Sequence, residues 1–362
     1  MSSRLPLIKQ VAYKIFIFTT AAAIILTVFL IFIRIPGINN YQRAMFGDMI
    51  YGNSDKPFVY RSLLPTAVRL ITGAIPQSVR ESINRYVEYL LNKPYPPRIN
   101  DVIEESNLSS WEQRLLTEYL AASILMIASL FGFYFSLKYL FVGVFSAPEW
   151  FMDGISLVAV ACLPAFFTHT NYIYDFSTLF LFTLGLGLMV RLKWRYFIVV
   201  FLIASFNKET TILLSLIFVV YLFRRWDVIE RTLFNRLLLI QVIGSLIIRA
   251  AIVWTFRENP GTSIEFHLFD FNLRFLLRPF SMTTIGTGLS LAILVFFKWS
   301  EKPVFLKRGL IILVPLMIST LLFGLLDELR ASYEVYPILV SLVAHSVGKI
   351  LDVDIISLPE AG

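Results

Sequence analysis

The charged tripeptide Asn207-Lys208-Glu209 lies between two apolar segments, residues 196–206 and 210–223, and basic residues bound each segment on its far side. A helix needs roughly 20 apolar residues to cross a bilayer, so neither segment crosses alone. A single span over both segments would place a lysine and a glutamate near the bilayer centre, at a cost on the order of 3 kcal/mol for each charge. The sequence therefore predicts two short helices that begin and end at the cytoplasmic face, with their polar tip in a protein-lined cavity.

Composition agrees with a membrane location. Hydrophobic residues make up 57% of the chain and charged residues only 16%, with a mean hydropathy of +0.71. These values are typical of a polytopic membrane protein and exclude an ordinary soluble domain. The net charge of +7 does not indicate nucleic-acid binding, because the lysines and arginines gather in short loops between apolar runs. Cys162 is the only cysteine, so no intrachain disulfide is possible.

A hydropathy window of about 19 residues predicts spanning segments along the whole chain. They are residues 12–34, 115–141, 152–168, 173–190, the half-pair 196–223, and then 237–255, 280–297, 309–326 and 335–349. With the N-terminus in the cytoplasm, this alternation places the basic segments 191–195, 224–236 and 298–308, and also Lys349, in the cytoplasm. We predict one all-α polytopic membrane domain over residues 1–362, with about 9 to 11 transmembrane or half-membrane helices.

The longest polar connection, residues 35–113, is predicted to lie outside the cytoplasm. Within it, residues 61–75 and 79–91 carry apolar residues at helical spacing with basic residues between them, as amphipathic helices on a membrane surface do. Nearly every other unusual polar segment is predicted to reach the same face. These segments are the turn 169–175, the Asn207 tip, the loop 256–279 and the turn 327–334. A functional site is therefore expected on this face.

Five short strings carry a family resemblance. They are Phe46-Gly47-Asp48, the run PFVYRSLLP from Pro57 to Pro65, Tyr174-Asp175-Phe176, FNKET from Phe206 to Thr210, and Glu328-Leu329-Arg330. Together with a first helix that is followed by a long outer loop, they resemble the GT-C class of integral-membrane glycosyltransferases. They are also similar to a group of uncharacterised bacterial membrane proteins of GT-C-like layout.

The resemblance implies a GT-C-like bundle with surface helices in its first outer loop. It further implies inverting transfer of a hexosyl or pentosyl group from a polyprenyl-phosphate donor, at a bacterial inner (plasma) membrane with the site facing the periplasm or exterior. In this class an acidic residue of the first outer loop acts on the acceptor hydroxyl. Asp48 stands at that position, and the next acid is Asp55.

The chemistry of such a transfer needs a base for the incoming proton and positive charge for the departing phosphate. Asp48 is the predicted catalytic base, and a turn-capping role is its alternative. Arg61 and Arg330 are predicted to hold the phosphate through bidentate hydrogen bonds. The alternatives are a lipid-headgroup contact for Arg61 and, for Arg330, a structural ion-pair network with the acids of its own turn, Asp327, Glu328 and Glu334.

The other predicted substrate-binding residues are aromatic or polar residues of the same outer face. They are Tyr60, His169, Asp175, Asn207, Lys208, Glu209 and Glu328. Pairing of Lys208 with Glu209 at the tip is a structural alternative, and Arg249 is predicted either to snorkel or to enter the cavity. Glu265, His267 and Asp270 make a divalent metal conceivable. The three histidines lack ligand spacing, however, so we predict no metal site and no cofactor.

Other functions remain open at this stage. A polysaccharide polymerase or ligase would use the same lipid-phosphate chemistry with a longer glycan. A lipid-linked glycan transporter would need charges near the midplane, often within repeats. A non-catalytic scaffold of the cell envelope would need no clustered Asp, Arg and Glu at span ends. The expected partners are a lipid-linked sugar donor and the lipid bilayer, without nucleic acid.

Overall fold

The computed structural model describes residues 7–92 and 111–358. In these residues the regular secondary structure is helical apart from one short antiparallel strand pair and one isolated bridge, so the predicted all-α class is confirmed. The helices of the bundle are α1 (Leu7–Arg34), α6 (Leu116–Val144), α7 (Glu149–Ala161), α8 (Asp175–Val190), α9 (Trp194–Asn207), α10 (Leu213–Leu222), α11 (Arg231–Thr255), α13 (Met282–Phe296), α15 (Leu313–Phe323) and α16 (Tyr336–Ile350).

The remaining elements connect these helices or cover their ends. The other helices are α2 (Phe46–Tyr51), α3 (Leu63–Gly73), α4 (Gln77–Asn92), α12 (Leu273–Leu276) and α14 (Val304–Gly309). Single turns of 3-10 helix include η2 (Phe58–Tyr60), η5 (Leu163–Phe166), η6 (Glu209–Ile212) and η10 (Leu329–Ser332). The strands are β1 (Phe145–Ser146) and β2 (Ile356–Ser357).

The outer surface of the bundle is apolar. Five of the described helical stretches are long and apolar enough to cross a membrane, namely residues 7–34, 113–144, 149–166, 231–255 and 304–323. Large side chains on their outer faces are exposed, for example Leu246 of α11 at 64% and Ile318 of α15 at 53%. Apolar surface of this extent is unfavourable in water and typical of contact with lipid. The chain is therefore a membrane protein with several spans.

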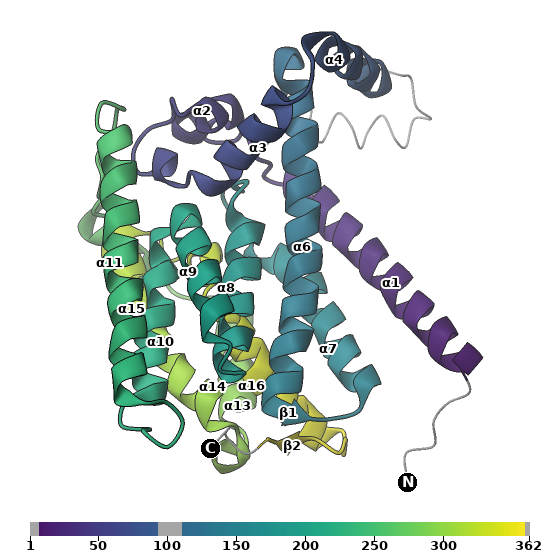
Figure 1. The fold of residues 1–362 in the computed structure, drawn as a ribbon, viewed down its shortest axis with the longest axis vertical. Coiled ribbons are helices and arrows are strands. Elements are labelled where there is room, and N and C mark those ends of the chain that lie inside the picture. Colours follow the sequence, from purple (N-terminus) through teal and green to yellow (C-terminus); the bar gives the residue numbers. More distant parts are fainter. Residues whose placement is uncertain (1–6, 93–110, 359–362) are drawn as a thin grey trace.

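The pair α9 and η6–α10 has the form that the sequence predicts. α9 contains 14 residues, about 21 Å of helix, which is shorter than a hydrocarbon core of roughly 30 Å. The chain breaks at Lys208, whose backbone is extended with φ −155° and ψ 141°. After the break the chain turns back through η6 into α10, which lies beside α9 (Figure 1).

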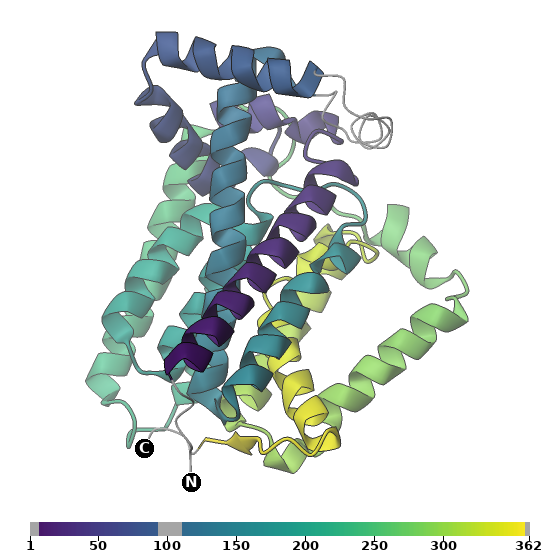
Figure 2. The same ribbon diagram turned by 90° about the vertical axis from the view of Figure 1, so that its right-hand side faces the viewer.

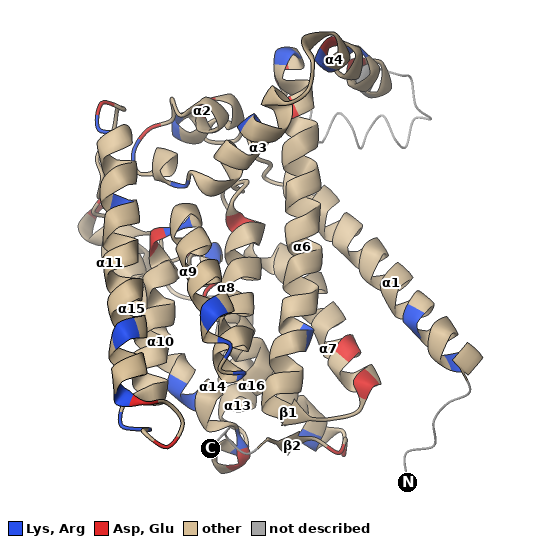
Figure 3. Ribbon diagram, in the orientation of Figure 1, with Lys and Arg blue, Asp and Glu red and all other residues tan. Residues whose placement is uncertain are grey.

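One end of the bundle, here called the outer end, is covered by α2, α3 and α4 (Figures 1 and 2). α3 and α4 coincide with the predicted amphipathic segments 61–75 and 79–91. Residues 93–110 of the predicted outer loop 35–113 lie outside the described residues. The opposite end carries turns rich in lysine and arginine, including those after α8 and α10 (Figure 3).

Contacts with α1 and α6 hold the first residues of α8 in place. A Cβ atom added to Gly132 of α6 would lie 2.7 Å from the ring of Phe180 in α8, so only glycine permits this approach. Asn171, just before α8, donates its side-chain amide to the backbone oxygen of Phe32 in α1 at 2.6 Å. The start of α8 is thereby held against both α1 and α6.

Candidate functional site

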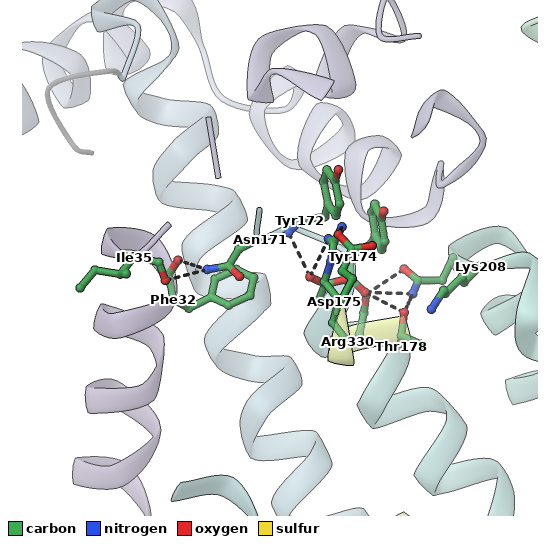
Figure 4. Close-up of polar contacts among 12 residues, drawn as sticks. Phe32, Ile35, Asn171, Tyr172, Tyr174, Asp175, Thr178, Lys208 and Arg330 are labelled. Atoms are coloured by element: carbon green, nitrogen blue, oxygen red, sulfur yellow. Dashed lines mark hydrogen bonds and ion pairs between the residues drawn. The ribbon is translucent and has the colours of Figure 1, made fainter. Parts of the chain in front are cut away.

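A buried network of charged and aromatic side chains lies at the outer end of the bundle. Four segments that are distant in sequence supply most of it: Arg61 after η2, residues 172–175 at the start of α8, residues 208–210 at the tip after α9, and residues 328–334 around η10. Figure 4 shows the part of this network around Tyr172, Tyr174, Asp175, Lys208 and Arg330. We call these four segments, together with Arg249 of α11, the outer network.

Arg61 pairs with the tip. Its Nη2 lies 2.6 Å from Oε1 of Glu209, and its guanidinium lies 5.4 Å from the centre of the Tyr174 ring. Burial is the largest single influence on Arg61 and disfavours its charged form, but the Glu209 carboxylate together with the Tyr174 and Tyr172 side chains outweighs it and raises the pKa of the guanidinium above its ordinary value. The Nε and Nη1 atoms of Arg61 are buried and have no hydrogen-bond partner among the described residues.

Arg330 occupies an equivalent position on the neighbouring tyrosine. Its guanidinium lies 3.9 Å from the centre of the Tyr172 ring, donates to Glu328, and places Nη1 3.7 Å from Oδ2 of Asp175. Burial opposes the charge on Arg330, but the carboxylates of Asp175 and Glu328 outweigh burial and raise its pKa. Asp175 also accepts a hydrogen bond from the backbone N–H of Tyr172 at 3.0 Å.

Lys208 and Glu209 do not pair with each other. Lys208 Nζ lies 2.8 Å from Oε1 of Glu334, a side chain with 0% exposure, and Thr210 donates to the same oxygen. Successive side chains on extended backbone point to opposite sides, so the two tip residues reach different partners. In the structural alternative for Arg330, Glu334 was one of its ion-pair partners. The structure pairs Glu334 with Lys208, whereas the Arg330–Glu328 pair of that alternative is present.

The rings of Tyr172 and Tyr174 are stacked, with centroids 5.3 Å apart and an interplanar angle of 5°. The Tyr172 ring also meets Phe58 of η2 at 5.3 Å. Burial raises the pKa of Tyr172 to about 12, so its phenol stays protonated near neutral pH. Aromatic faces of this kind suit the stacking of a sugar ring, as well as the arginine contacts that they make here.

Three predicted residues have other contacts. Asn207 is buried. It donates to Thr178 Oγ1 at 2.8 Å and to the backbone oxygen of Tyr174 at 3.2 Å, and accepts from Ser177 Oγ at 2.7 Å, so it links the end of α9 to the start of α8. His169 places Nε2 3.0 Å from Oδ2 of Asp327, and so joins two outer turns. The hydroxyl of Tyr60 lies 2.8 Å from Ser263 Oγ.

Asp48 is exposed and lies apart from the outer network. It lines a hollow of about 420 Å³ together with Gly47, Tyr51, Asn53, Glu112, Arg114 and Leu115, none of which belongs to the network. A Cβ at position 47 would lie 2.8 Å from Oε1 of Glu112, so the glycine lets this second carboxylate approach α2. Asp55, the other early acid, is paired with Arg43 at 2.8 Å.

Sequence reasoning missed one contribution to this end of the molecule and left a second one undecided. Glu112 precedes the second long helix, where the sequence indicates helix capping and no site, and only the fold brings it to the hollow of Asp48. Arg249, which the sequence left between two interpretations, enters the outer network, with its guanidinium 4.4 Å from the Tyr60 ring centre. A charge inside an apolar helix was the available signal.

The possible metal ligands are engaged in ion pairs. Glu265 lies 2.5 Å from Arg43, and His267 lies within 3.4 Å of Glu265 and 3.2 Å of Asp270. Within residues 7–92 and 111–358, no group of three or more His, Cys, Asp and Glu side chains is arranged to hold a metal ion.

The outer network contains buried polar atoms that could bind a ligand. Buried polar atoms without partners in the described part of the chain include Nε and Nη1 of Arg61, Nε of Arg330, the Tyr333 hydroxyl and Oε2 of Glu334. Buried polar groups are normally hydrogen-bonded, so guanidinium N–H groups left over in this position indicate a place for an acceptor. An oxyanion such as a phosphate matches the planar fork of an arginine.

Comparison with protein-family models, with curated proteins and with solved structures finds no match to this chain. Its function is therefore argued from the residues and their geometry.

Proposed function

We propose that this protein is a membrane glycosyltransferase that moves a sugar from a polyprenyl-phosphate donor to an acceptor outside the cytoplasm. The observation that carries the proposal is the outer network, in which Arg61 and Arg330 lie beside the stacked rings of Tyr172 and Tyr174 with guanidinium N–H groups unused among the described residues. Arginine forks recognise a phosphate, and the aromatic faces suit the attached sugar.

The membrane setting supports a lipid-linked donor over a soluble one. Apolar helices surround the network, so a donor whose tail partitions into lipid would present its phosphate at the outer end of the bundle. The architecture also fits the proposal, with short half-membrane helices and a long first outer segment that carries α2, α3 and α4. We accordingly propose a GT-C-like bundle of about 9 to 11 spanning or half-spanning helices in a bacterial inner membrane, with the site facing the periplasm.

Asp48 is the proposed base. The carboxylates of Asp175, Glu209 and Glu334 are each engaged with a cation, whereas Asp48 makes no ion pair among the described residues and faces solvent in its hollow. The reaction requires the donor to reach from the outer network to the hollow of Asp48, so that its anomeric carbon lies within reach of both. There the acceptor oxygen forms the new bond to that carbon as its proton passes to the Asp48 carboxylate. The bond from that carbon to the phosphate oxygen breaks, and the arginines hold the departing lipid phosphate.

One experiment tests both parts of this proposal. Purified protein in proteoliposomes is given a panel of farnesyl-phosphate hexoses and pentoses with membrane extract as the acceptor source, and the release and binding of farnesyl phosphate are measured. Asp48→Asn is expected to abolish release while binding persists, because an amide keeps the size of the side chain but takes no proton. Arg61→Lys and Arg330→Lys are expected to weaken binding despite the retained charge, and alanine to weaken it further.

Two results would contradict the assignment of roles. Release within a few-fold of wild type in Asp48→Asn would move the base elsewhere. Unchanged affinity in both alanine variants, with only a lower melting temperature, would make the arginines structural. Binding of farnesyl phosphate without release from any member of the panel would favour a transporter or scaffold of the cell envelope.

A further inference from the structure

Glu209 stands between two arginines at the solvent side of the outer network. Its Oε1 lies 2.6 Å from Arg61 Nη2, and its Oε2 lies 3.9 Å from Arg249 Nη1. The Glu209 side chain is 36% exposed, compared with 5% for Asp175 and 0% for Glu334. It is therefore the network carboxylate that can leave its partners at the smallest cost in desolvation.

The contacts of Arg249 are those of an anion-binding residue and not those of a snorkelling residue. It projects from the apolar helix α11 onto the face of Tyr60, and its only ion pair in the described residues is the long contact to Glu209. Two guanidinium groups thus converge on a single carboxylate. Each retains N–H groups that a second oxyanion could use, because an arginine offers five donors in a fixed fork.

We infer that Glu209 is a placeholder for the phosphate and that Arg249 is a third arginine of the anion site, beside Arg61 and Arg330. The inference rests on the proposed function and deepens it. When the donor binds, a phosphate oxygen replaces the Glu209 carboxylate between Arg61 and Arg249, and Glu209 turns toward solvent. Carboxylate and phosphate present similar oxygen pairs to an arginine fork, so the exchange replaces both the hydrogen bond from Arg61 and the longer ion pair with Arg249.

The direction in which one substitution changes phosphate affinity distinguishes this role from a structural one. A placeholder competes with the ligand, so Glu209→Gln, which keeps the size of the side chain and removes its charge, should strengthen phosphate binding. A purely structural Glu209 should do the opposite, because its loss would disorder the tip and Arg61 with it. Arg249→Gln should weaken binding, since it removes a ligand without touching the ion pair of Arg61.

The probes are inorganic phosphate and farnesyl phosphate, titrated into the full-length protein in detergent with calorimetric detection. Glu209→Gln is expected to bind both probes about fivefold more tightly than wild type, and Arg249→Gln about fivefold more weakly, the effect of one partly exposed charge pair. Matched controls are Glu258→Gln and Arg257→Gln, an exposed pair at the end of α11 with side chains 84% and 52% exposed, which should leave affinity unchanged.

The outcomes distinguish failure of the placeholder role of Glu209 from failure of the proposed function. Glu209→Gln binding at or below wild-type affinity, when wild type binds, overturns the placeholder and leaves the proposed function standing. Wild type that binds neither probe overturns both. If Glu209→Gln does not fold, Glu209→Asp replaces it, because the shorter carboxylate withdraws from Arg61 and should also tighten binding. Tighter binding of farnesyl phosphate relative to inorganic phosphate identifies the lipid-linked source, and equal binding identifies a free phosphate site.

Discussion

Replacement of Lys208 with methionine is expected to destabilise the protein far more than loss of an ordinary surface charge. Glu334 is fully buried, and Lys208, 13% exposed, is its only cationic partner within the described part of the chain, at 2.8 Å. Without the lysine, the Glu334 carboxylate keeps one hydrogen bond, from Thr210, while its Oε2 already has no partner among the described residues. Removal of one member of such a buried pair costs about 3 to 5 kcal/mol.

The assay is equilibrium unfolding in detergent of wild type, Lys208→Met, Glu334→Gln and the double variant. The double variant should be more stable than the sum of the single losses predicts, because no charge is then left buried and unpaired. Lys298→Met is the matched control. Its pair with Glu301 is 3.7 Å long and about half exposed, so the loss should stay within about 1 kcal/mol. Lys208→Met unfolding like this control, with additive effects in the cycle, would refute the buried pair.

Two further predictions concern topology and pH. In a Cys162→Ser background, cysteines at Ser78 and Lys193 should be labelled from opposite sides of the membrane, and labelling of both from one side would contradict the predicted orientation. Lys302 is buried, and burial lowers its pKa to about 8 from 10.5. Between these values the folded protein has released a proton that the unfolded chain still binds, so the free energy of unfolding should rise with pH over this window. Lys302→Met should abolish the rise, and an equal slope in the variant would exclude Lys302 as its source.

The helices were the predictable part of this fold. Runs of apolar residues bounded by charges give α1, α6 and α11 directly, because an apolar helix in lipid needs no partner to define it. The break at Lys208 followed from length, since neither flanking helix can cross a bilayer. The predicted span 152–168 was less accurate. The α-helix ends at Ala161, and η5 follows it with Pro164 near its start, a residue that cannot donate the next helical hydrogen bond.

Partners within the site were much less predictable than its members. The sequence selected Arg61, Lys208, Glu209 and Arg330, and the fold brings all of them into one network. It could not pair them, because Arg61 and Glu209 are 148 positions apart and no local pattern encodes such a contact. The same reason explains Glu334: the alternative interpretation paired it with Arg330, its neighbour in sequence, whereas the fold pairs it with the distant Lys208.

The tip after α9 explains why those residue types occur together. Charges inside an apolar bundle are tolerated only when other segments supply counter-ions. Lys208 pairs with Glu334, which follows η10. Glu209 pairs with Arg61, which follows η2, and with Arg249 of α11. A tip that only needed neutral packing would be more stable with apolar residues of the same volume. The buried Lys208–Glu334 pair therefore anchors the tip, while the half-exposed Glu209 is the part that can exchange partners. Stability and anion binding should consequently respond to different residues of one tripeptide, stability to Lys208 and affinity to Glu209.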